Sequence, residues 1–236
     1  MMNFKEEKLL VIAPHADDEV LGCCGLINKI KENGGEVYVQ VLTIGGYSKI
    51  EGVKVTKEAW RKEFLNVIKF LEIDGYDIAF YENKIRYLDT VSQKDLIDIL
   101  ESKSKVSLKK IKPTIIAIPT VFSSHQDHTH TYKAAITSLR PHPQNSVHVP
   151  KLVISYESSE YNHWSSYSEF GQFSPNFYLK MSKTELKKKI AALNMYKSQL
   201  RAGHRDGNKM SALSEIRGNE IGVSFAEAFH IHRFHV

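Results

Sequence analysis

Cysteine is scarce in this sequence, and long apolar runs are missing. The 236 residues include two cysteines, Cys23 and Cys24, which are neighbours. A disulfide between adjacent residues would be strained and would close no loop, so a disulfide framework is excluded. No apolar run approaches the roughly 20 residues that span a bilayer. We therefore expect no membrane span and no secretory signal, and we predict a cytoplasmic protein.

Charge of one sign is not in large excess either. Lys and Arg number 32 against 27 Asp and Glu, which gives a formal net charge of +5. The lysine clusters at 109–112 and 187–189 contain no aromatic residues that could stack on bases, so solvated helix faces explain them better. We therefore expect no nucleic-acid partner. With 42% hydrophobic and 25% charged residues, the composition is typical of globular proteins.

Strand-like and helix-like segments alternate along the chain. The unbroken apolar run Leu9–Ile12 is typical of a buried parallel strand, and apolar residues recur at helical spacing from Glu19 to about Asn33. With a strand over 36–44, this makes a βαβ unit. Further helices are predicted over 56–72, 95–106, 131–139 and 184–199, and further strands over 78–81, 114–118, 151–157 and 177–180.

This alternation predicts the fold class. We expect an α/β protein, a Rossmann-like three-layer sandwich around a mostly parallel sheet, in which ligands bind at the carboxyl ends of the strands. No internal repeat or linker divides the chain, so residues 1–236 are predicted to form a single domain. Residues 158–176 show no clear period and are predicted to form a long loop.

Charged and imidazole side chains are concentrated directly after the first predicted strand. His15, Asp17, Asp18 and Glu19 lie where that strand gives way to a helix. Clustered acids repel one another and raise one another's pKa unless a cation compensates, and a divalent metal ion is the simplest compensator. The alternative is that Asp17 or Asp18 merely caps the helix.

A second polar cluster follows the strand predicted over 114–118. It runs from Ser123 to His130 and includes His125, Asp127 and His128. Post-strand loops of a parallel sheet can converge at one edge. There His15, Asp18 and His128 can supply two imidazole nitrogens and one carboxylate oxygen to a zinc-like ion, with a coordination position left for water. The alternative for this loop is simply a polar surface.

Both clusters resemble motifs of a known family. Pro14-His15-Ala16-Asp17-Asp18-Glu19, followed by Gly22 and Gly25, resembles the P-H-P/A-D-D-E motif of the PIG-L/LmbE-like family of zinc-dependent N-deacetylases. His125-Gln126-Asp127-His128 resembles that family's H-x-D-H motif. The stretches 196–199 and 226–229 are similar to bacillithiol-type N-acetylglucosaminyl-malate deacetylases, so the resemblance runs from residue 9 to about residue 229.

The resemblance implies a metal site and a hydrolytic activity. It implies that His15, Asp18 and His128 are the metal ligands, with Zn²⁺ as the metal and Fe²⁺, Mn²⁺ or Co²⁺ as alternatives. The implied reaction removes the N-acetyl group from a GlcNAc-type sugar or glycoconjugate. Relatives also imply a homo-oligomer, a trimer or a hexamer.

Three more residues receive catalytic roles from the same resemblance. Asp17 is implied to be the general base that takes a proton from a water of lowered pKa. His125 is implied to stabilise the oxyanion or to protonate the leaving amine. Asp127 is implied to orient or charge a catalytic imidazole.

The sequence departs from the family pattern at three places. Ala16 replaces a frequent Pro, which removes no chemical group. Arg61 lies two residues before Glu63, and Trp60 stands at the usual position of the substrate-binding arginine, so Arg61 either binds substrate or forms a surface ion pair. Phe225 stands where relatives tend to have Tyr, so no hydroxyl is available there.

Two rival functions and two further features remain open at this stage. A nucleotide-binding Rossmann-like protein is disfavoured because Gly22-Cys23-Cys24-Gly25 does not complete a G-x-G-x-x-G turn. A metal-binding sugar-recognition module without catalysis is disfavoured by the presence of Asp17. The aromatic residues of the 158–176 loop either stack on a sugar or simply pack, and His230 and His232 either bind a second metal or belong to an exposed terminal strand.

Overall fold

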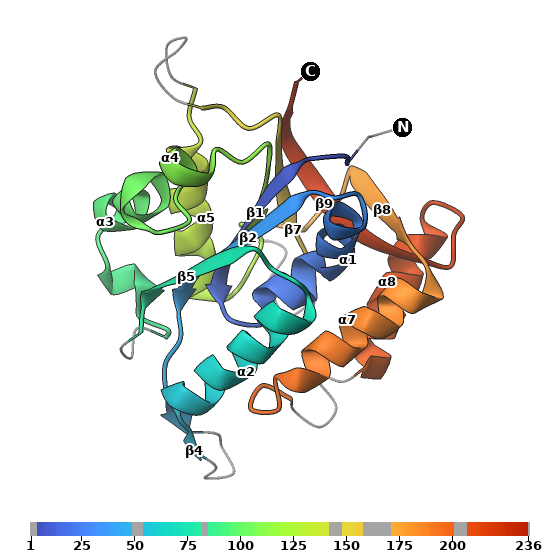
Figure 1. The fold of residues 1–236 in the computed structure, drawn as a ribbon, viewed down its shortest axis with the longest axis horizontal. Helices are drawn as coiled ribbons and strands as arrows, with labels where there is room; N and C mark the ends of the chain where they lie inside the picture. The colour runs from blue at the N-terminus through green and yellow to red at the C-terminus, as the bar shows by residue number, and fades with distance from the viewer. Residues whose placement is uncertain are drawn as a thin grey trace.

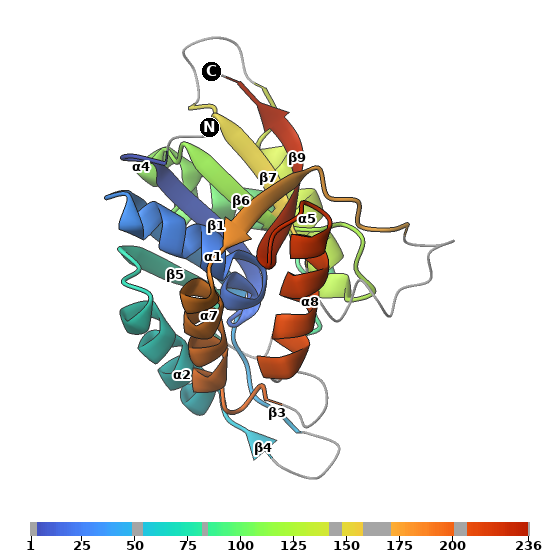
Figure 2. The same ribbon diagram turned by 90° about the vertical axis from the view of Figure 1, so that its right-hand side faces the viewer.

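A seven-stranded sheet organises the chain in the order β5-β2-β1-β6-β7-β9-β8 (Figures 1 and 2). The computed structural model describes residues 4–48, 54–81, 85–141, 148–157, 171–200 and 207–235. The strands of this sheet are β1 (Lys8–His15), β2 (Glu36–Thr43), β5 (Gly75–Phe80), β6 (Ile115–Pro119), β7 (Leu152–Tyr156), β8 (Phe177–Met181) and β9 (Phe225–Phe234). The short strands β3 (Tyr47–Ser48) and β4 (Lys54–Val55) pair separately.

The strands from β5 to β7 are mutually parallel, and β9 runs antiparallel to both of its neighbours. The strand β1 lies near the middle and is covered on both faces. Leu9 and Val11 pack into one hydrophobic cluster, while Leu10 and Ile12 pack into the other. This is why β1 is an unbroken apolar run rather than an alternating one.

Helices form a layer on each face of the sheet (Figures 1 and 2). One layer holds α1 (Asp18–Glu32), α2 (Lys57–Phe70), α7 (Lys183–Met195) and α8 (Gly207–Asn219). The other layer holds the 3₁₀ turn η1 (Leu88–Thr90), α3 (Gln93–Asp98), the π-helical η2 (Ile99–Lys103), α4 (Leu108–Ile111) and α5 (Gln126–Ser138). The predicted three-layer α/β fold is confirmed.

Several predicted boundaries are wrong. The helix predicted over 131–139 begins at Gln126, so the second motif lies in its first turn. The single helix predicted over 95–106 is a short α-helix that continues as a π-helix, and α8 is absent from the prediction. In the 158–176 loop, residues 158–170 lie outside the described residues, and 171–176 form no helix or strand. Among the described residues, no helix is long and apolar enough to cross a membrane.

The order in which strands are added to the sheet reverses between β1 and β6, although these two strands are parallel. From β1 the chain passes through α1 to β2 on one side, while β6 pairs with the other side of β1. Such a switch point leaves a crevice at the carboxyl ends of the two strands, where ligands bind in open α/β sheets. The two polar motifs follow these two strands.

Candidate active site

The turn between β1 and α1 is held by side chains from distant segments. His15 is the last residue of β1, and α1 begins at Asp18. The indole Nε1 of Trp60 donates to the carbonyl of Ala16 at 2.9 Å, and the Tyr156 hydroxyl donates to the carbonyl of Ile12 at 3.0 Å. The turn therefore has a fixed backbone on which its acidic side chains are presented.

The second motif forms the first turn of α5. His125 is the N-cap, and its Nδ1 accepts the backbone N–H of Asp127 at 3.1 Å. An imidazole thus does the capping that Ser, Thr, Asp or Asn usually does, which explains why the sequence predicts a later start for this helix. Asp127 and His128 follow within the turn, and both side chains are buried.

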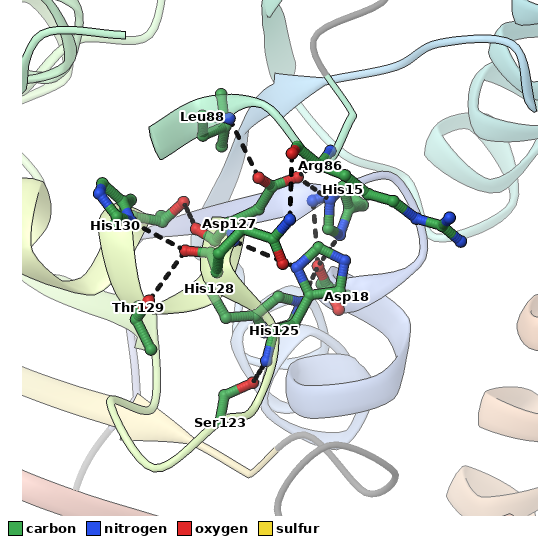
Figure 3. Close-up of polar contacts among 12 residues, drawn as sticks. His15, Asp18, Arg86, Leu88, Ser123, His125, Asp127, His128, Thr129 and His130 are labelled. Carbon is green, nitrogen blue, oxygen red and sulfur yellow. Dashed lines mark hydrogen bonds and ion pairs between the residues drawn. The ribbon is translucent and has the colours of Figure 1, made fainter. Parts of the chain in front are cut away.

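The two motifs meet at one carboxylate oxygen (Figure 3). Asp18 Oδ2 lies 3.5 Å from His15 Nδ1 and 3.4 Å from His128 Nε2. These three residues are buried, and their donor atoms all lie within 4.8 Å of one another. A tetrahedral zinc ion with bonds of about 2.0–2.1 Å separates its ligand atoms by about 3.3 Å. The spacing at Asp18 therefore suits coordination of a metal ion.

The donor types also fit zinc. Two imidazole nitrogens and one carboxylate oxygen are the ligands of catalytic zinc sites that keep a position for water. Such an ion would act as a Lewis acid and lower the pKa of water bound to it. Among the described residues, one other cluster could hold a metal ion, formed by His15, His125 and Asp127, and it shares His15 with the first.

Asp127 contacts His15. The carboxylate Oδ2 of Asp127 lies 2.8 Å from Nε2 of His15, on the opposite side of the imidazole from Asp18. The same carboxylate accepts the backbone N–H of Arg86 at 2.7 Å and that of Leu88 at 3.1 Å. Burial alone would raise the pKa of Asp127, but the hydrogen bond from His15 and these amides outweigh it and lower the pKa. The imidazole that Asp127 contacts is thus that of a predicted metal ligand.

The surroundings of His15 favour a positive charge. Burial lowers the pKa of His15, but the hydrogen bonds to Asp127 and Asp18 outweigh burial and raise it to about 9. In the protein alone, a proton on the imidazole compensates the negative charge of Asp127 and Asp18. A bound cation would compensate the same charge.

Asp17 has an unusual backbone conformation. Its φ of 124° lies in the region that favours glycine. It occupies the N-cap position, yet its side chain makes no capping hydrogen bond within the described α1 turn. Instead the Asp17 N–H donates to Glu19 Oε2 at 2.9 Å. Simple helix capping therefore does not explain this acid, and strained residues of this kind gather at functional sites.

His125 faces both predicted histidine ligands. Its ring centroid lies 4.9 Å from that of His15 and 5.3 Å from that of His128. Burial, followed by the neighbouring His15 and His128, lowers the pKa of His125 to about 3. Because Nδ1 accepts a backbone N–H, the neutral ring carries its proton on Nε2 and can act there as a hydrogen-bond donor.

Arg61 is exposed on α2, whereas the neighbouring Trp60 is buried. Its guanidinium sits 5.6 Å from the ring centroid of Tyr81, and it lines a groove of about 610 Å³ along β5. Trp60 instead stacks toward His15, with ring centroids 6.5 Å apart. Substrate binding by Arg61 stays a prediction. The sequence places Trp60 on the inner face of this helix but gives it no part in the site, although it stands where the family pattern has its substrate-binding arginine.

The remaining sequence features have structural explanations. Gly22 and Gly25 lie inside α1, where an added Cβ would come 2.2 Å from the Tyr156 ring and 2.8 Å from Glu227. They allow close packing and form no phosphate-binding turn. The His230 and His232 rings are 5.1 Å apart on β9. Among the described residues, no third His, Cys, Asp or Glu completes a metal cluster with them.

The fold and this donor set together define a Rossmann-like α/β protein with a candidate metal centre at its switch point. The model of the PIG-L family, described as GlcNAc-PI de-N-acetylase, matches residues 10–139, which is more than half of the chain. The chain therefore belongs to the PIG-L family of de-N-acetylases, as its motifs predict. The narrower similarity to bacillithiol-type enzymes stays a prediction.

The chain is also similar in sequence to a curated relative and in fold to solved structures. The uncharacterized deacetylase YaiS of Escherichia coli (strain K12) is 26% identical over 199 residues, covering 82% of this chain and 92% of YaiS. The conserved protein TT1542 from Thermus thermophilus shares the fold with a TM-score of 0.73 and 23% identity, over 98% of this chain and 96% of that one. The N,N'-diacetylchitobiose deacetylase from Pyrococcus horikoshii shares the fold with a TM-score of 0.71 and 22% identity, over 95% of this chain and 83% of that one.

Proposed function

We propose that this protein is a metal-dependent hydrolase that removes the N-acetyl group from a GlcNAc-type sugar or glycoconjugate. His15, Asp18 and His128 hold the metal ion, and Asp17 is the general base. The observation that carries the proposal is the position of Asp18 Oδ2 within 3.5 Å of both imidazoles, with the strained Asp17 adjacent to it in the chain. Zn²⁺ suits the donor set, and Fe²⁺, Mn²⁺ and Co²⁺ are the alternatives.

The reaction is an acyl transfer to water. A bound Zn²⁺ would supply Lewis acidity at the acetamide carbonyl and lower the pKa of water. Asp17 takes a proton from the water as its oxygen adds to the carbonyl carbon. The carbon–nitrogen bond then breaks, the proton passes to the departing nitrogen, and the products are acetate and a free amine.

His125 and Asp127 support this reaction in different ways. His125 donates from Nε2 to the carbonyl oxygen as negative charge develops there, which is the role of an oxyanion donor. Asp127 fixes the ring and tautomer of His15 so that Nδ1 faces Asp18. Asp127 therefore acts on the metal ligand, while His125 acts on the substrate.

The substrate class follows from the family and its members. The family model is described by its action on GlcNAc-PI, and the Pyrococcus horikoshii neighbour acts on N,N'-diacetylchitobiose. Both are N-acetylated sugars, which supports a substrate of this class for the present chain. Arg61 is carried forward as a predicted substrate contact, with a surface ion pair as the alternative, and the aromatic residues predicted to stack on the sugar belong to the 158–176 loop, of which 158–170 lie outside the described residues.

An amine-release assay tests the proposal. Zinc-loaded protein is incubated with GlcNAc, N,N'-diacetylchitobiose and GlcNAc glycosides, and free amine and acetate are measured with zinc content. We expect equal amounts of amine and acetate from at least one sugar, and a loss of about 10²–10⁴-fold in kcat for Asp17→Asn with zinc content unchanged. Full turnover by zinc-loaded Asp17→Asn would show that Asp17 is not the base. Zinc-loaded protein that releases no amine from any sugar would favour the non-catalytic module.

A further inference from the structure

Tyr196 connects the end of α7 to the head of α1. Its hydroxyl donates to Glu19 Oε1 across 177 positions of sequence, and both side chains are fully buried. The other oxygen of this carboxylate, Glu19 Oε2, accepts the backbone N–H of Asp17 at 2.9 Å. Tyr196, Glu19 and Asp17 thus form a hydrogen-bonded chain that ends on the backbone of the proposed base.

The last link of this chain holds a strained residue. At a φ of 124°, Asp17 adopts a backbone conformation that is unfavourable for a residue with a side chain. Such a conformation persists only when surrounding contacts determine it. The hydrogen bond from the Asp17 N–H to Glu19 is a contact that does so, and Tyr196 fixes the carboxylate that receives it.

The turn that contains Tyr196 is hydrogen-bonded to the neighbouring helix α2. Ser198 donates its backbone N–H to Glu63 Oε1 at 3.0 Å and its hydroxyl to Glu63 Oε2 at 2.5 Å. Gln199 Nε2 donates to the Ser198 hydroxyl at 2.9 Å. The 196–199 segment therefore links α2 with the turn between β1 and α1 that contains Asp17.

We propose that Tyr196 is a positioning residue that acts through Glu19 to hold Asp17 in the geometry required of the general base. Tyr196 is too deeply buried to touch a substrate, so it acts through another group. This inference rests on the proposed function, because the role of Asp17 as a base belongs to it. The inference explains why the 196–199 segment is part of the family resemblance although it supplies no metal ligand.

Tyr196→Phe tests the inference because it removes one hydroxyl and keeps the volume of the ring. We expect zinc content to be unchanged, KM to stay within about 3-fold, and kcat to fall about 10- to 100-fold, as a misplaced catalytic group predicts. The matched control is Tyr38→Phe, which removes a tyrosine–glutamate hydrogen bond of 2.7 Å to Glu36 away from the site. It should leave kcat unchanged.

The double variant Asp17→Asn/Tyr196→Phe separates positioning from an independent role. If Tyr196 acts through Asp17, the double variant should turn over no more slowly than Asp17→Asn alone. A wild-type kcat for Tyr196→Phe would overturn the inference. So would a Tyr196→Phe substitution that lowers kcat by the same factor in the Asp17→Asn background as in the wild type. Full activity of zinc-loaded Asp17→Asn would instead overturn the assigned base.

Hydrogen exchange gives a readout that needs no activity. The Asp17 amide should exchange at least about 10-fold faster in Tyr196→Phe than in the wild type, and Tyr38→Phe should show no change. Unchanged protection of this amide would contradict the inference. Should Tyr196→Phe fail to fold, Ser198→Ala serves instead, since it loosens the same turn from its half-buried side and should lower kcat without changing KM.

Discussion

Nε2 of His15 and Oδ2 of Asp127 lie 2.8 Å apart, although 112 positions separate these residues in the sequence. The contact lies on the opposite side of the imidazole from Asp18, whose Oδ2 is 3.5 Å from Nδ1. A carboxylate that accepts a hydrogen bond from one ring nitrogen of a histidine sets the tautomer and makes the other nitrogen a more basic metal ligand. The second motif thus supports the proposed ligand His15 of the first motif and also contains the proposed ligand His128.

This contact predicts that Asp127→Asn weakens metal binding. We expect zinc affinity to fall about 10- to 100-fold, because the neutral amide no longer favours the tautomer of His15 whose Nδ1 binds metal. Zinc competition against a chromophoric chelator measures the change. Asp98→Asn, which alters a surface carboxylate paired with Lys94 and Lys103, is the control and should bind zinc as the wild type does. Equal affinities of the two variants would contradict the role of Asp127.

The backbone conformation of Arg86 predicts that one substitution is tolerated and another is not. Arg86 has a φ of 65°, and its N–H donates to Asp127. Arg86→Gly should keep the free energy of unfolding within about 1 kcal/mol and leave zinc affinity unchanged, because glycine adopts this conformation readily. Arg86→Val should cost about 1–3 kcal/mol and weaken zinc binding, since a β-branched residue resists it. Urea denaturation and zinc titration check both, and weaker zinc binding by the glycine variant would instead implicate the Arg86 side chain.

The close contact between α1 and β7 predicts a steric cost at Gly22. A Cβ there would lie 2.2 Å from Cδ2 of Tyr156, so Gly22→Ala should lower the free energy of unfolding by about 3 kcal/mol. Gly34→Ala is the control. A Cβ at Gly34 would meet no atom within 4 Å, but the backbone there has a φ of 75°, which is unfavourable for alanine. It should cost only the strain of that conformation, about 1–2 kcal/mol. Similar losses for both variants would argue against steric contact as the cause.

A buried ion pair joins α7 and β9 to the middle of α1. Lys189 Nζ donates to Glu227 Oε1 at 2.7 Å and to the Leu21 carbonyl at 2.8 Å, and Glu227 accepts the N–H groups of Gly25 and Leu26. Lys189→Met should cost about 3–5 kcal/mol because it leaves a buried carboxylate uncompensated. Lys189→Met/Glu227→Gln should cost less, since no buried charge is left and the amide oxygen can still accept one of the two N–H groups of α1.

Urea denaturation of the single and double variants checks this expectation. The exposed ion pair of Lys94 and Asp98 provides the control, and Lys94→Met should not shift the denaturation midpoint measurably. A double variant that is less stable than Lys189→Met would contradict the prediction, because it would show that the charge of Glu227 stabilises α1 by itself.

The sequence predicts the central sheet well for a physical reason. The strands β1 and β6 are buried on both faces, so they are unbroken apolar runs that are easy to recognise. Because both motifs directly follow these strands, their convergence at one edge is also predictable. The topology thus brings together the segments that carry His15, Asp18 and His128, whose donor atoms lie within 4.8 Å of one another.

Other parts of the structure leave little trace in the sequence. The inward residues of α8 include Ser214 and Gly218 beside Met210, so no apolar stripe marks this helix. The start of α5 is hidden because His125 caps it. Contacts such as Tyr196 with Glu19 depend on how segments far apart in the chain pack together, which residue spacing does not encode.

Calorimetric zinc titration of the wild type, His128→Gln and His130→Gln tests the central claim most directly. His130 lies on the same helix, but its Nδ1 is 3.1 Å from the Gln126 carbonyl and it belongs to neither candidate metal cluster of the described residues. We predict one tightly bound zinc per chain in the wild type and in His130→Gln, and binding at least about 100-fold weaker in His128→Gln. One zinc bound to His128→Gln with wild-type affinity would contradict the assignment of His15, Asp18 and His128 as the metal site.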